Sequence, residues 1–187
     1  LAVARELLLA LCDIHDANAV HGDVKPGNII VSASGELAHA TLIDFAFSRS
    51  IVALQADDEE RAGTALYMAP EQAGLFGRGA DARSDLYSLG LTLFEALAGY
   101  HPLRRAGQRE SDSDTSLSEI LRAHLLVTPP SLSLVVQAVP EALAEVVRRL
   151  LQMDPRDRYQ TAAGVLADLD EIVAARRLGV LEPPVLI

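Results

Sequence analysis

The chain has 187 residues, half of them hydrophobic, and a formal net charge of −10. This length suits one domain with a buried core, and the hydrophobic share excludes a disordered chain. The negative charge argues against nucleic acid and anionic membrane surfaces as partners, and no apolar run is long enough for membrane insertion.

The first predicted element is a helix over Leu1–Asp16, which has apolar residues at helical spacing. It contains Cys12, the only cysteine, which cannot form an internal disulfide. We therefore expect a buried thiol in a reducing cytoplasm. Two short β-branched and aliphatic runs follow, Asn28–Ser32 and Ala40–Ile43. Ser34 and Gly35 between them predict a hairpin.

Hydrophobic periodicity is lost between Asp44 and Glu71, and the acidic run at residues 57–60 indicates an exposed loop. Ser84 or Asp85 is then expected to cap a helix that stops at Gly99. Residues 104–118 are polar and predict a mobile insert. Three more helices are predicted: residues 117–126, residues 140–153 with Pro140 in the first turn, and residues 162–177 with Thr161 as cap.

Four polar side chains of the segments HGDVKPGN (residues 21–28) and IDF (residues 43–45) suggest a chemistry. Asp23, Lys25, Asn28 and Asp44 form a set that can align a hydroxyl nucleophile, hold metal-bridged phosphates and compensate negative charge in phosphoryl transfer. The simpler alternative is a polar turn whose side chains bond to local backbone. Four single histidines lack metal-ligand spacing and are expected at the surface or in helix packing: His15, His39, His101 and His124.

Five motifs in chain order resemble the C-terminal lobe of eukaryotic-type Ser/Thr protein kinases, and the resemblance runs nearly end to end. They are HGDVKPGN at 21–28, DFA at 44–46, GTALYMAPE at 63–71, SDLYSLG at 84–90 and DPRDRY at 154–159. The implied fold is mainly α with a small β-hairpin sheet, which is the α+β kinase fold without its N-terminal lobe. The implied organisation is a partial kinase domain over residues 1–177 and a linker over residues 178–187.

The resemblance implies transfer of the ATP γ-phosphoryl group to Ser or Thr hydroxyls of a protein substrate. Asp23 would be the base for the substrate hydroxyl, since a carboxylate accepts a hydrogen bond without donating one. Lys25 would steady the transferring phosphoryl group, and it marks the Ser/Thr branch. Asn28 and Asp44 would hold Mg²⁺, which prefers hard oxygen ligands.

Four further residues are implied to have supporting roles. Thr64 would shape the floor of the peptide-substrate site. Glu71 and Arg158 would form a buried ion pair that ties this segment to the late helices, so both would be structural. Asp85 would support the backbone of the catalytic loop from below.

Two positions depart from the family pattern. Gly22 stands where most relatives carry an Arg that clamps a phosphorylated activation loop. We therefore expect activity that does not depend on phosphorylation of Ser48, Ser50 or Thr64. Ala46 replaces a Gly, and if that position needs a positive φ the strain is of order 1 kcal/mol, which would tune the loop without inactivating it.

The phosphate-gripping parts of the family's N-terminal lobe do not precede the catalytic loop in this sequence. We therefore expect the segment alone to bind ATP weakly and to expose the apolar floor of the cleft. The runs PEQAG at 70–74 and DRYQTA at 157–162 are similar to large bacterial hybrid signalling proteins. That likeness implies an N-terminal kinase lobe and further signalling domains in the parent chain.

A pseudokinase-like interaction module without phosphotransfer is the alternative from another functional class. Gly22 and Ala46 favour it. The retained Asp23, Lys25, Asn28 and Asp44 argue against it, because a docking surface needs none of them.

Overall fold

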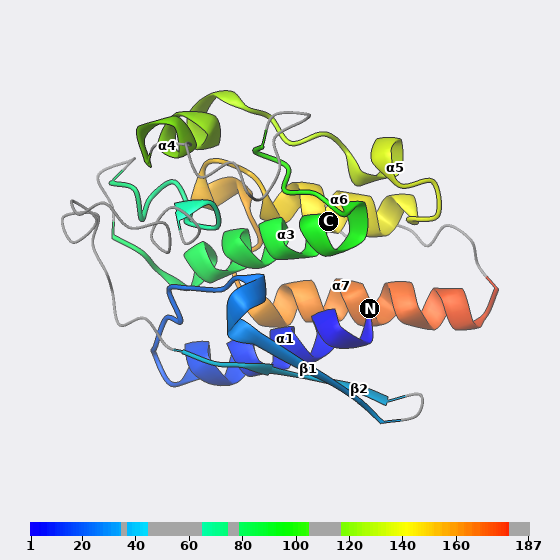
Figure 1. Ribbon diagram of the computed structural model, residues 1–187. Helices are drawn as coiled ribbons and strands as arrows, with labels where there is room; N and C mark the ends of the chain where they lie inside the picture. The colour runs from blue at the N-terminus through cyan, green and yellow to red at the C-terminus, as the bar shows by residue number, and fades with distance from the viewer. Residues whose placement is uncertain (35–36, 45–64, 75–78, 105–116, 180–187) are drawn as a thin grey trace.

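The computed structural model describes residues 1–34, 37–44, 65–74, 79–104 and 117–179. These ranges are mostly helical, with a two-stranded sheet lying along one side (Figure 1). The predicted class, mainly α with a small hairpin, is confirmed.

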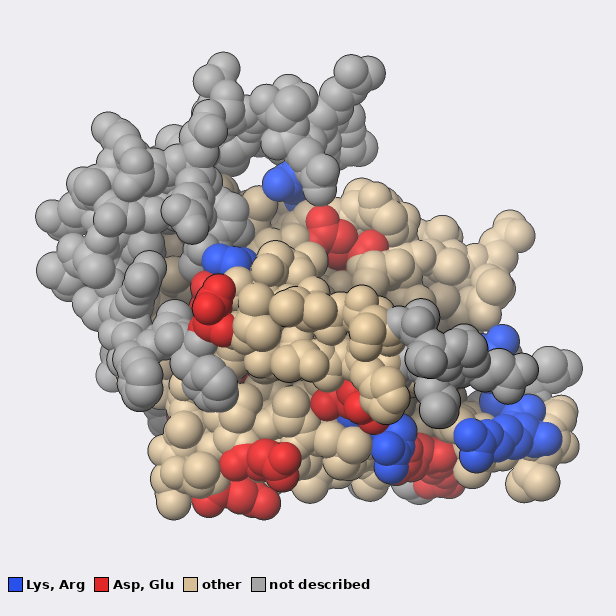
Figure 2. All heavy atoms as spheres, turned by 60° about the horizontal axis from the view of Figure 1, so that its bottom comes forward, with Lys and Arg blue, Asp and Glu red and all other residues tan. Residues whose placement is uncertain are grey.

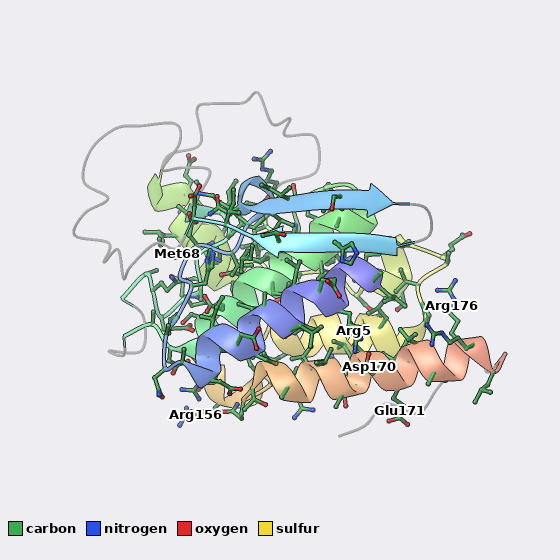
Figure 3. All side chains as sticks on the ribbon, turned by 90° about the horizontal axis from the view of Figure 1, so that it is seen from below. Arg5, Met68, Arg156, Asp170, Glu171 and Arg176 are labelled. Carbon is green, nitrogen blue, oxygen red and sulfur yellow. The ribbon has the colours of Figure 1, made fainter. Side chains whose placement is uncertain are left out.

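Helix α1 (Ala2–Asp16) forms where it was predicted and buries the stripe Leu7, Leu8 and Leu11. It packs against the sheet and against α7 (Ala162–Arg177), which runs beside it (Figure 1). Figure 3 shows the two helices from below, where an Arg5–Asp170 ion pair of 2.9 Å joins their exposed faces. Thr161 caps α7 as predicted, because its hydroxyl accepts the N–H of Gly164 at 3.1 Å.

The hairpin consists of β1 (Ile29–Ser34) and β2 (Leu37–Leu42), paired antiparallel from Ile29↔Leu42 to Ser34↔Leu37. Both strands extend closer to the turn than predicted, because backbone pairing continues beyond the β-branched residues. Asn28 was predicted to begin the first strand. It lies instead in a 3-10 turn, η1 (Pro26–Asn28), immediately before it.

Helix α3 (Ala82–Ala98) runs through the centre of the molecule and ends at Gly99, as predicted. Its cap is Asp81, so the prediction of Ser84 or Asp85 was wrong. The Asp81 carboxylate accepts the N–H of Arg83 at 2.9 Å, and the Ser84 hydroxyl accepts the N–H of Asp81 at 3.1 Å. The two bonds form a capping box that extends the helix by one turn toward its N-terminus.

Helix α4 (Leu117–Leu126) has the predicted bounds, and α5 (Leu132–Val135) is a single added turn. Helix α6 (Glu141–Leu150) has Pro140 as its N-cap, where the prediction put the proline inside the first turn. It also ends before Met153, and a 3-10 turn η4 (Pro155–Asp157) follows. Most of the predicted insert at residues 104–118 and of the linker lies outside the described residues.

The two larger clusters of buried apolar side chains both include residues of α3, and a third, small cluster joins Ala65, Leu66 and Ile120. Leu86 and Leu89 face the cluster shared with α1, α6 and α7. Tyr87, Leu91 and Phe94 face the cluster shared with α5 and α6. None of the described helices combines the length and apolarity that crossing a bilayer requires. Figure 2 shows small separate groups of acidic and basic side chains on the lower face, with a wide uncharged area between them.

Candidate functional site

The loop between α1 and β1 is held by a buried carboxylate on the first turn of α3. Asp85 accepts the N–H of His21 at 2.9 Å and the N–H of Gly22 at 2.8 Å. His15, near the end of α1, places its Nε2 2.9 Å from the same carboxylate. Gly22 has φ +78°, a conformation that side chains disfavour, so glycine suits this position.

The peptide group that joins Gly22 to Asp23 is bound at both of its polar atoms. Its carbonyl oxygen accepts Nε2–H of Gln72 at 3.1 Å. Its N–H donates to Nδ1 of the buried His21 at 3.3 Å. Since Nδ1 accepts, the proton of His21 is on Nε2, which lies 3.1 Å from the carbonyl of Ile43. The peptide that leads into Asp23 is therefore held by Gln72 and by His21, and His21 is itself bound to Ile43.

Asp23, Lys25 and Asn28 meet at one carboxylate oxygen. Oδ2 of Asp23 lies 2.9 Å from Lys25 Nζ and accepts Asn28 Nδ2–H at 2.9 Å. The same amide nitrogen also lies 2.8 Å from the main-chain oxygen of Asp23. The side chains of Asp23 and Lys25 are 15% and 19% exposed, so the group is open to solvent at one side. Asn28 thus bonds to local backbone, as the polar-turn alternative predicts, and its side chain also bonds to that of Asp23.

A backbone hydrogen bond next to Asp44 connects it to this group. The N–H of the preceding Ile43 donates to the carbonyl of Asn28 at 2.9 Å. Asp44 itself is exposed and has φ +58°. Its carboxylate makes no hydrogen bond or ion pair to another described residue. Within the described ranges, no group of three or more His, Cys, Asp or Glu side chains is placed to hold a metal ion.

The segment Ala65–Ala69 is attached to α3 and α4. Ser88 donates its hydroxyl to the carbonyl of Tyr67 at 2.7 Å, and the Tyr67 hydroxyl bonds to Glu95. On α4, His124 Nε2 lies 3.0 Å from the carbonyl of Ala65. Burial lowers the pKa of His124, so this imidazole is neutral at pH 7 and donates Nε2–H.

Glu71 and Arg158 form a bidentate ion pair with distances of 2.7 and 2.9 Å, and their side chains are 1% and 0% exposed. The Ser84 hydroxyl also donates to Glu71 at 2.8 Å. Arg158 lies over the ring of Tyr87, with its guanidinium carbon 4.7 Å from the centroid. Its remaining N–H groups donate to the carbonyls of Arg83, Gln152 and Met153. The structure thus brings together the two residues that the resemblance paired.

Several predicted residues lie outside the described ranges: Thr64, Phe45, Ala46, Ser48 and Ser50. Conversely, no predicted role fell on Gln72, and His15 and His124 were expected at the surface or in helix packing. The one sequence signal for Gln72 was its position directly after the APE triplet. Nothing in the local sequence indicates that its side chain reaches Gly22.

Comparison with known proteins places this site in context. A family model described as "Protein kinase domain" matches residues 2–168. The serine/threonine-protein kinase PknL of Mycobacterium tuberculosis is 36% identical over 172 residues, which are 91% of this chain and 40% of that protein. PksC of Streptomyces coelicolor is 33% identical over 175 residues, 94% of this chain and 30% of that protein.

Among solved structures, the kinase domain of Mycobacterium tuberculosis PknI is similar with a TM-score of 0.59 and 26% identity. The match covers 91% of this chain and 53% of that domain. The chain therefore spans about half of a kinase domain and at most about 40% of the first curated relatives that it matches.

Proposed function

Because this chain belongs to the protein kinase domain family, we propose that it carries the catalytic loop of a Ser/Thr protein kinase. The reaction is transfer of the γ-phosphoryl group of ATP to Ser or Thr hydroxyls of a protein substrate. The observation that supports this most is the meeting of Lys25 and Asn28 at the solvent-accessible carboxylate of Asp23.

Asp23 is the proposed base. Its Oδ2 is held by Lys25 and Asn28, so the carboxylate has one orientation in which to receive a substrate hydroxyl. Lys25 brings a positive charge 2.9 Å from that oxygen, where it can also compensate charge on a transferring phosphoryl group. Phosphoryl transfer depends mainly on such positioning and charge compensation.

Asn28 and Asp44 are the proposed Mg²⁺ ligands, and their chemistry fits that metal. Both offer hard oxygen atoms, and Mg²⁺ commonly takes one or two protein ligands beside waters and substrate phosphates. Both bonds of the Asn28 amide nitrogen go to Asp23, so the amide oxygen is the atom left for a cation. A bound Mg²⁺ would neutralise charge on the phosphates of ATP.

We further propose that residues 1–177 form the C-terminal lobe, that residues 178–187 are a linker, and that an N-terminal lobe and further signalling domains belong to the parent chain. The 53% coverage of the PknI kinase domain supports a missing lobe. So does strand β1, where Ile30 and Val31, two and three residues after Asn28, are 56% and 53% exposed. Thr64 is assigned to the substrate site, whereas Glu71, Asp85 and Arg158 are structural.

The proposal is tested with the complete kinase domain, expressed with its N-terminal lobe. Wild type should transfer phosphate to protein in the presence of Mg-ATP. Asp23→Asn should lower kcat by about 10²- to 10⁴-fold, because general-base catalysis contributes that much. The variant keeps the shape of the side chain, so its melting temperature should stay close to that of wild type.

The interaction-module alternative makes the opposite forecast. It is favoured if wild type binds protein partners but transfers no phosphate under any Mg-ATP condition. A wild-type rate that Asp23→Asn leaves unchanged would also reject the proposed base.

A further inference from the structure

Gln72 bridges the catalytic loop and the segment Ala65–Ala69. Its amide nitrogen donates to the carbonyl of Gly22 at 3.1 Å, and its amide oxygen accepts the N–H of Ala69 at 2.8 Å. The two ends of the amide thus have different partners, which fixes the side chain in one orientation.

The backbone that carries Gln72 is itself rigid. Its N–H donates to the carbonyl of Ala69 at 2.9 Å, and the N–H of Ala73 donates to that of Pro70 at 3.1 Å. The preceding residue, Glu71, is bound by the buried guanidinium of Arg158. The amide of Gln72 therefore extends from a fixed turn toward Gly22.

We propose that Gln72 is a positioning residue for Asp23, a role that rests on the proposed kinase function. The carbonyl it binds belongs to the peptide group that leads directly into Asp23. Rotation of this peptide would change the direction of the Asp23 side chain. Small displacements of a reacting group cost up to about 10²-fold in rate, so the bond acts on turnover.

The glycine at position 22 gives such a bond a reason. Glycine explores backbone conformations that other residues avoid, and Gly22 has no side chain to hold it in place. Asp85 holds the peptide before it and Gln72 holds the peptide after it. The neutral amide of Gln72 thus links the backbone at Gly22 to the backbone at Ala69.

The test compares two variants of the complete kinase domain. Gln72→Met removes both hydrogen bonds at similar volume. Gln72→Glu keeps an acceptor for Ala69 but turns a second oxygen toward the Gly22 carbonyl. At pH 8 each should lower kcat by about tenfold, the effect of losing roughly one hydrogen bond in the transition state, with KM for ATP unchanged.

The pH dependence separates positioning from a general structural role. Once protonated, the carboxyl group that Gln72→Glu introduces can donate O–H to Gly22 while its carbonyl oxygen accepts from Ala69. The introduced carboxylate would be half-buried and would face the Gly22 carbonyl oxygen, and both effects raise its pKa above the usual Glu value of about 4.3. The kcat of Gln72→Glu relative to wild type should therefore rise as the pH falls from 8 to 5.5, whereas the Gln72→Met ratio stays flat. Gln152→Met is the matched control, because it removes only a bond to the carbonyl of Arg148 on α6, and it should leave kcat unchanged.

Wild-type kcat for both variants, or a Gln72→Glu ratio that does not change with pH, would overturn the role of Gln72. An inactive wild type would overturn the kinase proposal instead. In that case, amide hydrogen exchange of residues 21–25 still tests whether Gln72 holds the loop. Exchange should be about tenfold faster in Gln72→Met than in wild type, the effect of losing roughly one hydrogen bond, and equal rates would reject the bridge.

Discussion

Arg158 illustrates how one residue can hold distant segments together. Its guanidinium binds both carboxylate oxygens of Glu71 and also three backbone carbonyls, so each of its nitrogens has a partner. A buried ion pair adds little net stability by itself, but loss of one partner leaves an uncompensated charge in the core. The two residues therefore depend on each other.

We expect Glu71→Ala to destabilise the kinase domain by about 3–5 kcal/mol, because the Arg158 charge would remain buried. Chemical denaturation measures this directly. The control is Asp170→Ala, which breaks the Arg5–Asp170 pair on the surface, where the side chains are 45% and 46% exposed. Its effect should stay below about 1 kcal/mol. Equal losses for the two variants would contradict a buried charge pair.

The buried His101 should make the stability of the folded protein depend on pH. Burial lowers the pKa of His101 from 6.5 to about 3, and the neighbouring His124 and Arg104 act in the same direction. The unfolded chain therefore binds a proton that the folded protein excludes. Stability from this group is complete above pH 6.5 and is lost as the pH falls toward 3, by about 1.4 kcal/mol per pH unit.

Urea denaturation at pH 7 and pH 5 checks this. His101→Asn keeps an acceptor for the N–H of Leu103, which His101 Nδ1 accepts at 3.3 Å, but it does not titrate. The variant should lose less stability between the two pH values than wild type does. Parallel losses in the two proteins would show that His101 is protonated in the folded state.

At the scale of elements, the contact between α3 and α6 depends on a glycine. A Cβ atom at Gly90 would lie 2.8 Å from Leu150 Cβ and 3.0 Å from Leu151 Cδ2. These distances are too short for the two helices to keep their separation. This close approach explains why a glycine stands at position 90.

Gly90→Ala should destabilise the domain by about 1–3 kcal/mol through overpacking, although alanine is the better helix former. Thermal or urea denaturation gives the value. Gly164→Ala on α7 is the matched helical control, since its Cβ would meet nothing closer than 3.4 Å. That change should be neutral or stabilising by up to about 1 kcal/mol. A stabilising effect at both glycines would refute the close contact.

Local patterns predicted the elements better than the contacts between them. The bounds of α1, α4 and α7 were predicted nearly to the residue. Helical spacing indicated α1 and the Thr161 cap indicated α7, and both signals are local in the sequence. The start of α3 was misassigned because Asp81 and Ser84 cap it jointly. The motifs also named the side chains at the site. They could not reveal that Gln72 reaches Gly22, since that bond joins residues 50 positions apart.

At the scale of the molecule, the exposed strand β1 predicts a covering partner. Ile30→Thr should change the stability of this segment alone by no more than about 0.5 kcal/mol, because the side chain is already exposed. In the complete kinase domain the same change should weaken ATP binding or lower stability more strongly. Ser32→Thr, farther along the exposed strand, is the control and should have little effect in either form.

Measurements of denaturation and of KM for ATP in both forms check this prediction. If Ile30→Thr has the same small effect with and without the N-terminal lobe, the apolar side chain faces solvent in the complete protein too. The proposed position of the missing lobe would then be wrong.

The first turn of α3 touches three parts of the protein at once. Asp85 holds the loop at residues 21–22, Ser84 binds Glu71, and the carbonyl of Arg83 accepts from Arg158. The loop at residues 21–22, Glu71 and Arg158 are therefore all bound to the same helical turn. If α3 moves, the loop at residues 21–22 and Glu71 should move with it, so the distance between these two parts should change little.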